Sequence, residues 1–101
     1  MYAFIQDVPI EDAVYRQISE KIGDQPPDGQ LVHLVLRRPE GGLRYVDVWE
    51  SAQAYARAVE DVIHPAVHAT LQDSGIRPQG EPATTQFEVV ELVGQLTTSR
   101  T

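Results

Sequence analysis

The chain of 101 residues contains no cysteine. Disulfide bonds, thiolate metal sites and cysteine nucleophiles are therefore excluded. Basic side chains are few, with 8 against 15 acidic ones, and the formal net charge is -7. A surface of this charge repels phosphate backbones, so we expect no nucleic-acid partner.

Long apolar runs are also missing. Residues 1–7 have no basic flank and form too short an apolar run for a signal peptide. No run approaches the roughly 20 apolar residues that a membrane-spanning helix needs. We therefore expect a cytoplasmic protein without a membrane partner. The length fits one domain, which we place at residues 1–96, followed by a frayed tail at 97–101.

The clearest structural signal lies between residues 31 and 51. Two runs rich in β-branched, aromatic and aliphatic residues, 31–37 and 43–50, flank the turn sequence Pro39-Glu40-Gly41-Gly42. This pattern predicts a β-hairpin. Ser51 follows at once and is a suitable N-cap for a helix.

The remaining elements follow from periodicity and from turn residues. The pattern of residues 2–8 predicts a first strand. Residues 11–22 carry an apolar stripe at helical spacing, which predicts a helix that ends at Gly23. A second helix runs from Ser51 towards Gly75, and Pro65 predicts a kink or a new helix within it. Residues 86–96 predict a last strand. The order β-α-β-β-α-β is typical of an α+β, ferredoxin-like sandwich with both helices on one face of an antiparallel sheet.

Two helices leave the other face of the sheet uncovered. Strand residues alternate between faces, and we expect the aliphatic sets to meet the helices: Ala3, Ile5, Val32, Leu34, Leu36, Val46, Val48, Val90 and Leu92. The uncovered face would then carry mainly aromatic and aliphatic side chains, too apolar to stay in water. We expect a second copy to pack there, through an interface of Tyr2, Phe4, Val35, Phe87 and Val89.

His33 and Asp47 lie on adjacent predicted strands and on the same face. If they are opposite each other, the carboxylate can orient the imidazole, which is half of a general-base arrangement. The alternative is a buried ion-pair network across a dimer, with Arg37 and Glu91 as further members. We favour the network, because a polar pair in an aromatic interface must be satisfied internally.

His64 and His68 are four residues apart, and Asp61 precedes His64 by three. On a regular helix these side chains share a face and offer metal ligands. Pro65 follows His64 directly and is expected to disturb that spacing. We therefore expect no metal site.

The element order, the segment Val46-Asp47-Val48-Trp49-Glu50-Ser51 leading into a helix, and Ile63-His64-Pro65-Ala66 resemble the dimeric α/β-barrel superfamily. Within it, the chain is similar to small proteins related to antibiotic-biosynthesis monooxygenases, over nearly its whole length. The resemblance implies a homodimer whose two sheets close into a barrel, with a cleft between helices and sheet. Such proteins include cofactor-independent monooxygenases, haem-degrading enzymes and lactone isomerases.

The resemblance also implies site residues. Haem-degrading members use an asparagine, a tryptophan and a helical histidine; Trp49 and His64 match two of these, but the chain has no asparagine. We therefore expect no cofactor. Cofactor-free members imply aromatic walls around a phenolic substrate, for which Tyr15, Tyr45 and Trp49 are the ligand-binding candidates. His33, His64 and Asp47 are the catalytic candidates.

Two functions stay open at this point. The first is a homodimer without catalysis, which binds a small apolar or aromatic ligand or serves as an assembly module. The lack of a sharp catalytic motif favours it. The alternative is a cofactor-independent monooxygenase or isomerase acting on an aromatic or polyketide-like molecule, which the resemblance favours.

Overall fold

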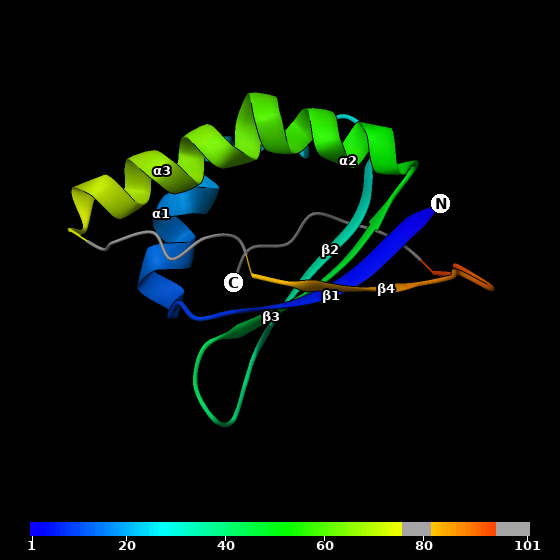
Figure 1. Ribbon diagram of the computed structural model, residues 1–101, viewed down its shortest axis with the longest axis horizontal. Coiled ribbons are helices and arrows are strands. Elements are labelled where there is room, and N and C mark those ends of the chain that lie inside the picture. The colour runs from blue at the N-terminus through cyan, green and yellow to red at the C-terminus, as the bar shows by residue number, and fades with distance from the viewer. Residues whose placement is uncertain (76–81, 95–101) are drawn as a thin grey trace.

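The computed structural model describes residues 1–75 and 82–94. In chain order the elements are β1 (Tyr2–Val8), α1 (Asp12–Ile22), β2 (Gln30–Arg37), β3 (Leu43–Trp49), α2 (Ala52–Ala58), the π-helical turn η1 (Val59–Ile63), α3 (His64–Asp73) and β4 (Thr84–Phe87). The strands form one antiparallel sheet in the order β2-β3-β1-β4. This is the predicted ferredoxin-like arrangement (Figure 1).

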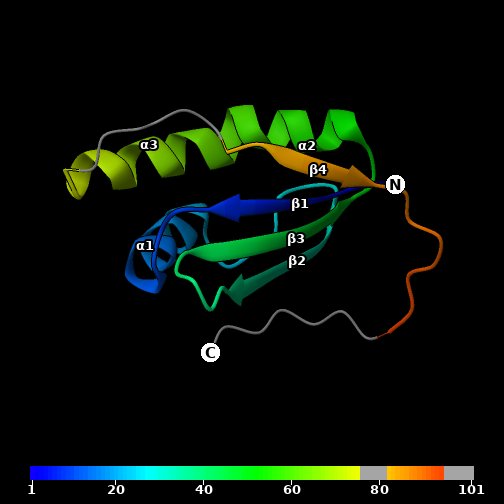
Figure 2. The same ribbon diagram turned by 60° about the horizontal axis from the view of Figure 1, so that its bottom comes forward.

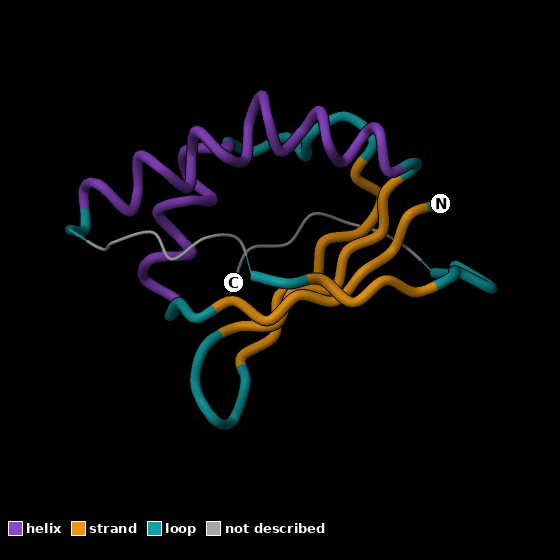
Figure 3. The backbone as a smooth tube through the Cα atoms, viewed as in Figure 1, coloured by secondary structure: helices purple, strands orange, loops and turns teal. Residues whose placement is uncertain are grey.

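The helices lie on one side of the sheet. The segment α2–η1–α3 forms one continuous arch above the strands, and α1 lies below α3 (Figures 1 and 3). A hydrogen bond fastens the two helices together, because Lys21 Nζ donates to Thr70 Oγ1 at 3.0 Å. Thr70 is fully buried. Among the described residues, no helix has the length and apolarity to cross a membrane.

Local chemistry explains where the elements begin and end. β1 stops before Pro9, and α1 stops at Gly23, whose φ of 98° favours glycine. Ser51 caps α2, since its side chain accepts the backbone N–H of Ala54 at 3.0 Å. In the β2–β3 hairpin, Gly42 has a φ of 79°, and a Cβ atom at this position would lie only 3.0 Å from the backbone oxygen of Val8. Both features favour glycine at this position. These boundaries agree with the predicted ones to within about a residue.

Pro65 interrupts the helical ladder without breaking the helix. The backbone N–H of His64 bonds to Val59 O, five residues back, which is π-helical hydrogen bonding. Pro65 then stands in the first turn of α3, where its missing N–H costs little. The predicted new helix therefore exists, but it begins at His64 and continues the preceding segment.

The strand residues divide into two sets as predicted, but the prediction of which set meets the helices is wrong. Phe4 is 2% exposed and Trp49 is fully buried, and both pack with Ala58 beneath α2. Tyr2 pairs with Trp49 across the strands, so it lies on this covered face too. Val35 lies opposite Tyr45 on the same face. Large rings bury more apolar area beneath a helix than the aliphatic side chains would, which favours this arrangement.

The uncovered face is consequently aliphatic. Leu34 is 48% exposed, Leu36 is 42% exposed and Phe87 is 54% exposed. Phe87 lies opposite Ala3, so its placement on the uncovered face agrees with the prediction. Tyr2, Phe4 and Val35 do not lie on that face.

The last strand is shorter and earlier than predicted. β4 ends at Phe87, and residues 88–94 form no strand, so Val89 lies beyond the sheet. Val90 is 98% exposed and Val93 is 77% exposed, which contradicts the inward placement of Val90. The end of the predicted strand and the predicted tail 97–101 lie outside the described residues.

Candidate functional site

The most organised polar group on the covered face joins three residues from three elements. His33 of β2 lies directly opposite Asp47 of β3, and its Nδ1 is 2.8 Å from Asp47 Oδ1. Its other ring nitrogen, Nε2, is 2.8 Å from the hydroxyl of Tyr15 on α1. We call this group the Tyr15–His33–Asp47 triad.

The hydrogen bonds fix which nitrogen of His33 carries the proton. An ionised carboxylate only accepts hydrogen bonds, so Nδ1–H must donate to Asp47. In the neutral imidazole Nε2 is then unprotonated and accepts the Tyr15 hydroxyl. The side chain of Asp47 is 5% exposed and that of His33 is 27% exposed. The orienting carboxylate is thus buried, while the imidazole is accessible to solvent.

Trp49 supplies the second hydrogen bond to the Asp47 carboxylate. Its indole N–H donates to Asp47 Oδ2 at 3.0 Å, from two residues further along the same strand. Each carboxylate oxygen therefore has a donor, which compensates for removing the charge from water. From the sequence we expected the Trp49 ring to contact a ligand, and the hydrogen bond to Asp47 was missed. The spacing of two residues, which places both side chains on one face of a strand, was the available signal.

Tyr45 packs against the triad from β3. Its ring lies edge-on to His33, at 5.2 Å between centroids, and edge-on to Tyr15, at 5.7 Å. Burial raises the pKa of the Tyr45 hydroxyl far above its ordinary value, and nearby Tyr15 and Asp47 raise it further. The Tyr45 side chain is therefore neutral at physiological pH and presents an uncharged ring beside the triad.

Gln6 is a further residue of this face that the sequence analysis missed. It lies opposite Tyr45, is 7% exposed, and donates from Nε2 to the backbone oxygen of Pro82 at 2.7 Å. The hydrogen bond ties β1 to the segment that enters β4. Glutamine within an apolar strand was a weak signal of such a buried bond.

Other predicted polar residues lie elsewhere. Arg37 pairs with Asp12 at the start of α1, and its side chain is 70% exposed. Glu91 is exposed beyond the end of β4. Within the described residues, the His33–Asp47 pair therefore forms without the proposed network of Arg37 and Glu91.

His64 is not part of the triad. It lies exposed on α3, where its ring contacts that of His68, at 5.3 Å between centroids. The described residues contain no group of three or more histidine, aspartate or glutamate side chains placed to hold a metal ion. The expectation that Pro65 disturbs the spacing is wrong for this pair, because both histidines belong to α3.

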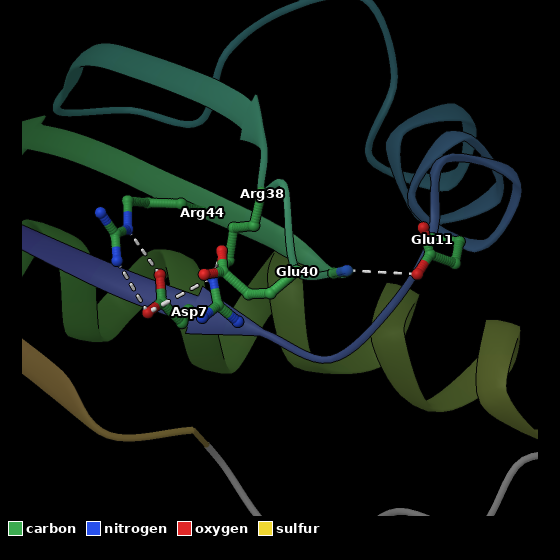
Figure 4. Close-up of polar contacts among 6 residues, drawn as sticks. Asp7, Glu11, Arg38, Glu40 and Arg44 are labelled. Atoms are coloured by element: carbon green, nitrogen blue, oxygen red, sulfur yellow. Dashed lines mark hydrogen bonds and ion pairs between the residues drawn. The ribbon is translucent and has the colours of Figure 1, made fainter.

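Ion pairs stabilise the tip of the β2–β3 hairpin. Arg44 donates to both oxygens of Asp7, at 2.7 and 3.1 Å, and Arg38 lies between Asp7 and Glu40 (Figure 4). The Arg44 guanidinium lowers the pKa of Asp7. The backbone N–H of Gly42 donates to Glu11 at 3.2 Å. These contacts pair the cations of the tip with carboxylates, so the tip is a structural junction between the hairpin and the start of α1.

Two open pockets lie away from the triad. One, of about 340 Å³, is lined by residues of α1, η1 and α3, including Lys21 and Asp61. The other, of about 290 Å³, is on the uncovered face and includes Ile5, Arg44 and Phe87. Neither pocket includes His33.

No family model matches the chain, and no curated protein sequence matches it. Solved structures do. A candidate antibiotic biosynthesis monooxygenase from Nitrosomonas europaea aligns over 90% of this chain and 100% of its own, with a TM-score of 0.64 and 11% identity. A mutant of SnoaB, a cofactor-independent oxygenase from Streptomyces nogalater, aligns over 93% of this chain and 97% of its own, with a TM-score of 0.55 and 15% identity.

The haem-degrader MhuD from Mycobacterium tuberculosis, with two haems in its active site, aligns over 93% of this chain and 100% of its own. Its TM-score is 0.50 and its identity is 21%. Together these matches show that the chain has the fold of the antibiotic-biosynthesis-monooxygenase-like proteins, the ferredoxin-like fold of dimeric α/β barrels. The resemblance seen in the sequence is thereby confirmed at the level of the fold.

Among the described residues, those that the resemblance suggests for haem binding do not fit this group. His64, the helical candidate for an axial ligand, is exposed and lies beside His68. Trp49 is buried and bonded to Asp47. Both ring nitrogens of His33 have partners already.

Proposed function

We propose that the protein is a homodimer that binds a small phenolic or enolisable aromatic molecule beside the Tyr15–His33–Asp47 triad. We propose further that it acts on this molecule as a cofactor-independent monooxygenase or isomerase. The observation that carries the proposal is the unbroken hydrogen-bonded connection from Tyr15 through His33 to a buried carboxylate. This supports the catalytic alternative of the sequence analysis over simple binding.

The triad can remove a proton from such a ligand. The ligand hydroxyl gives its proton to the Tyr15 oxygen while the Tyr15 proton moves to His33 Nε2. The resulting imidazolium keeps its Nδ1–H bond to Asp47, whose negative charge stabilises it. The ligand is left as an electron-rich phenolate or enolate. Return of the proton to a carbon atom of the anion gives an isomer. Reaction with molecular oxygen instead places one oxygen atom on that carbon and releases the other as water, so that the phenol itself supplies the electrons and is oxidised to a quinone.

The aromatic side chains around the triad suit a planar ligand. Tyr15, Tyr45 and His33 contact one another through their rings, and Tyr45 stays neutral, so the site offers stacking surfaces without a second charge. These rings can pack against the ring of a phenol, whose proton the triad then removes. The SnoaB match lends support, since that protein with the same fold is a cofactor-independent oxygenase.

The dimer part of the proposal rests on the uncovered face. Leu34, Leu36 and Phe87 are each more than 40% exposed on it, beside Ile5 and Val46. Apolar surface of this extent favours burial against another surface. A second copy presents the same face, so two sheets can pack together with the helices outside. The proposed interface keeps Phe87 of the predicted set and leaves out Tyr2, Phe4 and Val35, which lie on the covered face.

The test is a titration of the protein with a panel of small phenols and hydroxyquinones near neutral pH. We expect at least one compound to bind as its anion, seen as phenolate absorbance below the pH at which the free compound ionises. His33→Gln and Tyr15→Phe should leave the compound neutral, while Arg57→Gln, exposed on α2, should behave like the wild type. Oxygen consumption and product analysis then separate oxygenation from isomerisation.

If the compound binds equally as an anion to wild type and His33→Gln, the triad is not the base. If compounds bind without proton removal or turnover, the non-catalytic binding function is supported in place of the enzyme. Circular dichroism of each variant verifies that the fold is intact.

A further inference from the structure

We propose that His64 and His68 form a two-histidine site for a divalent transition-metal ion, such as Zn²⁺, Ni²⁺ or Cu²⁺, on the surface of α3. The site is separate from the Tyr15–His33–Asp47 triad and does not depend on the proposed function. It uses two of the three histidines of the chain.

The spacing of the two residues is the first support. His64 and His68 both lie in α3, four residues apart, which places their side chains one above the other on one helix face. The π-helical turn before His64 takes up the disturbance from Pro65, so α3 itself keeps regular spacing. Two imidazoles at this spacing can reach a common metal ion, as they do in helical zinc sites.

The exposure and the bonding of the two imidazole rings give the second argument for the metal site. Their centroids are 5.3 Å apart with the ring planes at 68°, and both residues are exposed. In the described part of the chain, neither imidazole is engaged in a hydrogen bond or an ion pair. Their ring nitrogens are therefore open to a metal ion without the loss of a protein contact.

Negative charge around the two histidines favours the binding of a cation. Glu60 and Asp61 are exposed on η1, directly before His64, and the net charge of the chain is -7. Such a field raises the local concentration of cations. The described residues supply no third metal ligand beside the two histidines. Water therefore fills the remaining coordination positions of the metal ion. Imidazole ligands without carboxylate or thiolate partners favour Ni²⁺, Cu²⁺ and Zn²⁺ over Mg²⁺ or Ca²⁺.

The test is a titration of the full chain with ZnCl₂ at about pH 7.5, where imidazole is mainly in its neutral, metal-binding form. Nuclear magnetic resonance follows the imidazole signals, and calorimetry gives the affinity. With three histidines in the chain, single substitutions assign every signal. We expect the His64 and His68 signals to shift together and the His33 signals to stay unchanged.

The variants probe the chelate geometry. His64→Gln and His68→Gln should each lower the affinity at least about tenfold, because one imidazole holds the ion poorly alone. The matched control combines His68→Gln with Gln72→His, which keeps the number of histidines but separates them by two helical turns. It should lose the affinity to the same extent.

Two outcomes overturn the proposal. One is a zinc-dependent shift of His33 without shifts of His64 and His68, or no shift at all. The other is an affinity that persists in the spaced control. The wild-type titration alone decides the first point, even where a variant fails to fold.

Discussion

Trp49 donates its indole N–H to Asp47 Oδ2 at 3.0 Å, and the two residues stand side by side on the covered face of β3. The other oxygen of the same carboxylate holds His33. A buried carboxylate with one donor on each oxygen has a fixed plane and therefore fixes the imidazole bonded to it. The indole, a hydrogen-bond donor that never ionises, thus positions His33 through Asp47.

The first prediction concerns the loss of this donor. Trp49→Phe leaves a buried carboxylate oxygen without a partner, which costs roughly 1–3 kcal/mol in the free energy of unfolding beyond the loss of packing. Urea denaturation measures the change. Phe4→Leu is the matched control, because Phe4 is equally buried beside Trp49 but has no polar atom in its side chain. Equal losses in the two variants would show that the indole bond contributes nothing.

The second prediction concerns the proton on His33. In Asp47→Asn, the amide oxygen must face Trp49, since the indole can only donate. The amide NH₂ then faces His33 Nδ1 and donates to it, so the imidazole proton moves to Nε2. Nitrogen-15 chemical shifts should report the Nδ1–H form in the wild type and the Nε2–H form in the variant.

This change of tautomer removes the basic nitrogen that faces Tyr15. Proton removal from a bound phenol should slow by about 10²-fold or more, in line with the usual contribution of a general base. An Asp47→Asn variant that keeps the Nδ1–H form, or keeps the wild-type rate, would contradict the assigned role of Asp47.

The sequence predicted the local structure well, because short-range chemistry determines it. Pro9, Gly23 and Ser51 end or begin elements through their own backbone geometry or side-chain bonds. The tight hairpin turn also sets the register of β2 against β3. Counting back from it places His33 opposite Asp47, the register that the sequence analysis had stated only as a condition.

The covered face could not be predicted in the same way. Alternation separates the residues of a strand into two sets, but here both sets are largely apolar, and composition does not tell which one the helices meet. The aromatic set with its polar residues is covered because those polar groups bond to one another and to α1. Tyr15 and His33 are 18 residues apart in the chain, and their contact depends on the tertiary packing of α1 against β2, which no local pattern encodes.

The third prediction concerns stability at alkaline pH. Burial raises the pKa of Tyr45 above its ordinary value of 10.0. The folded chain therefore keeps the Tyr45 proton where the unfolded chain loses it, and the stability from this neutral, buried hydroxyl is fully present below about pH 10 and falls as the pH rises further.

Tyr45→Phe removes this dependence. Unfolding free energies measured between about pH 8 and pH 11 should fall less steeply in the variant, by up to about 1.4 kcal/mol per pH unit above pH 10. Tyr2→Phe, on the same sheet face, is the comparison, since the Tyr2 hydroxyl accepts a hydrogen bond from Gln86 at an exposed position. Parallel curves for wild type and Tyr45→Phe would show that the Tyr45 hydroxyl ionises in the folded chain.

The last prediction concerns the uncovered face. Leu34 is 48% exposed in the single chain and lies opposite Val46, among aliphatic neighbours. Leu34→Glu places a charge where the second copy would pack, and a charge buried without a partner costs several kcal/mol. Sedimentation at micromolar concentration should show a dimer for the wild type and a monomer for Leu34→Glu, with unchanged circular dichroism.

Gln53→Glu is the matched control, because it adds the same charge at an exposed position of α2, on the helical side of the molecule (Figure 2). It should sediment like the wild type. A wild-type monomer would remove the dimer from the proposed function, and the triad would remain, since all three of its residues come from one chain. A dimer that survives Leu34→Glu would instead place the interface elsewhere and leave the exposed aliphatic side chains of the sheet to be covered by another partner.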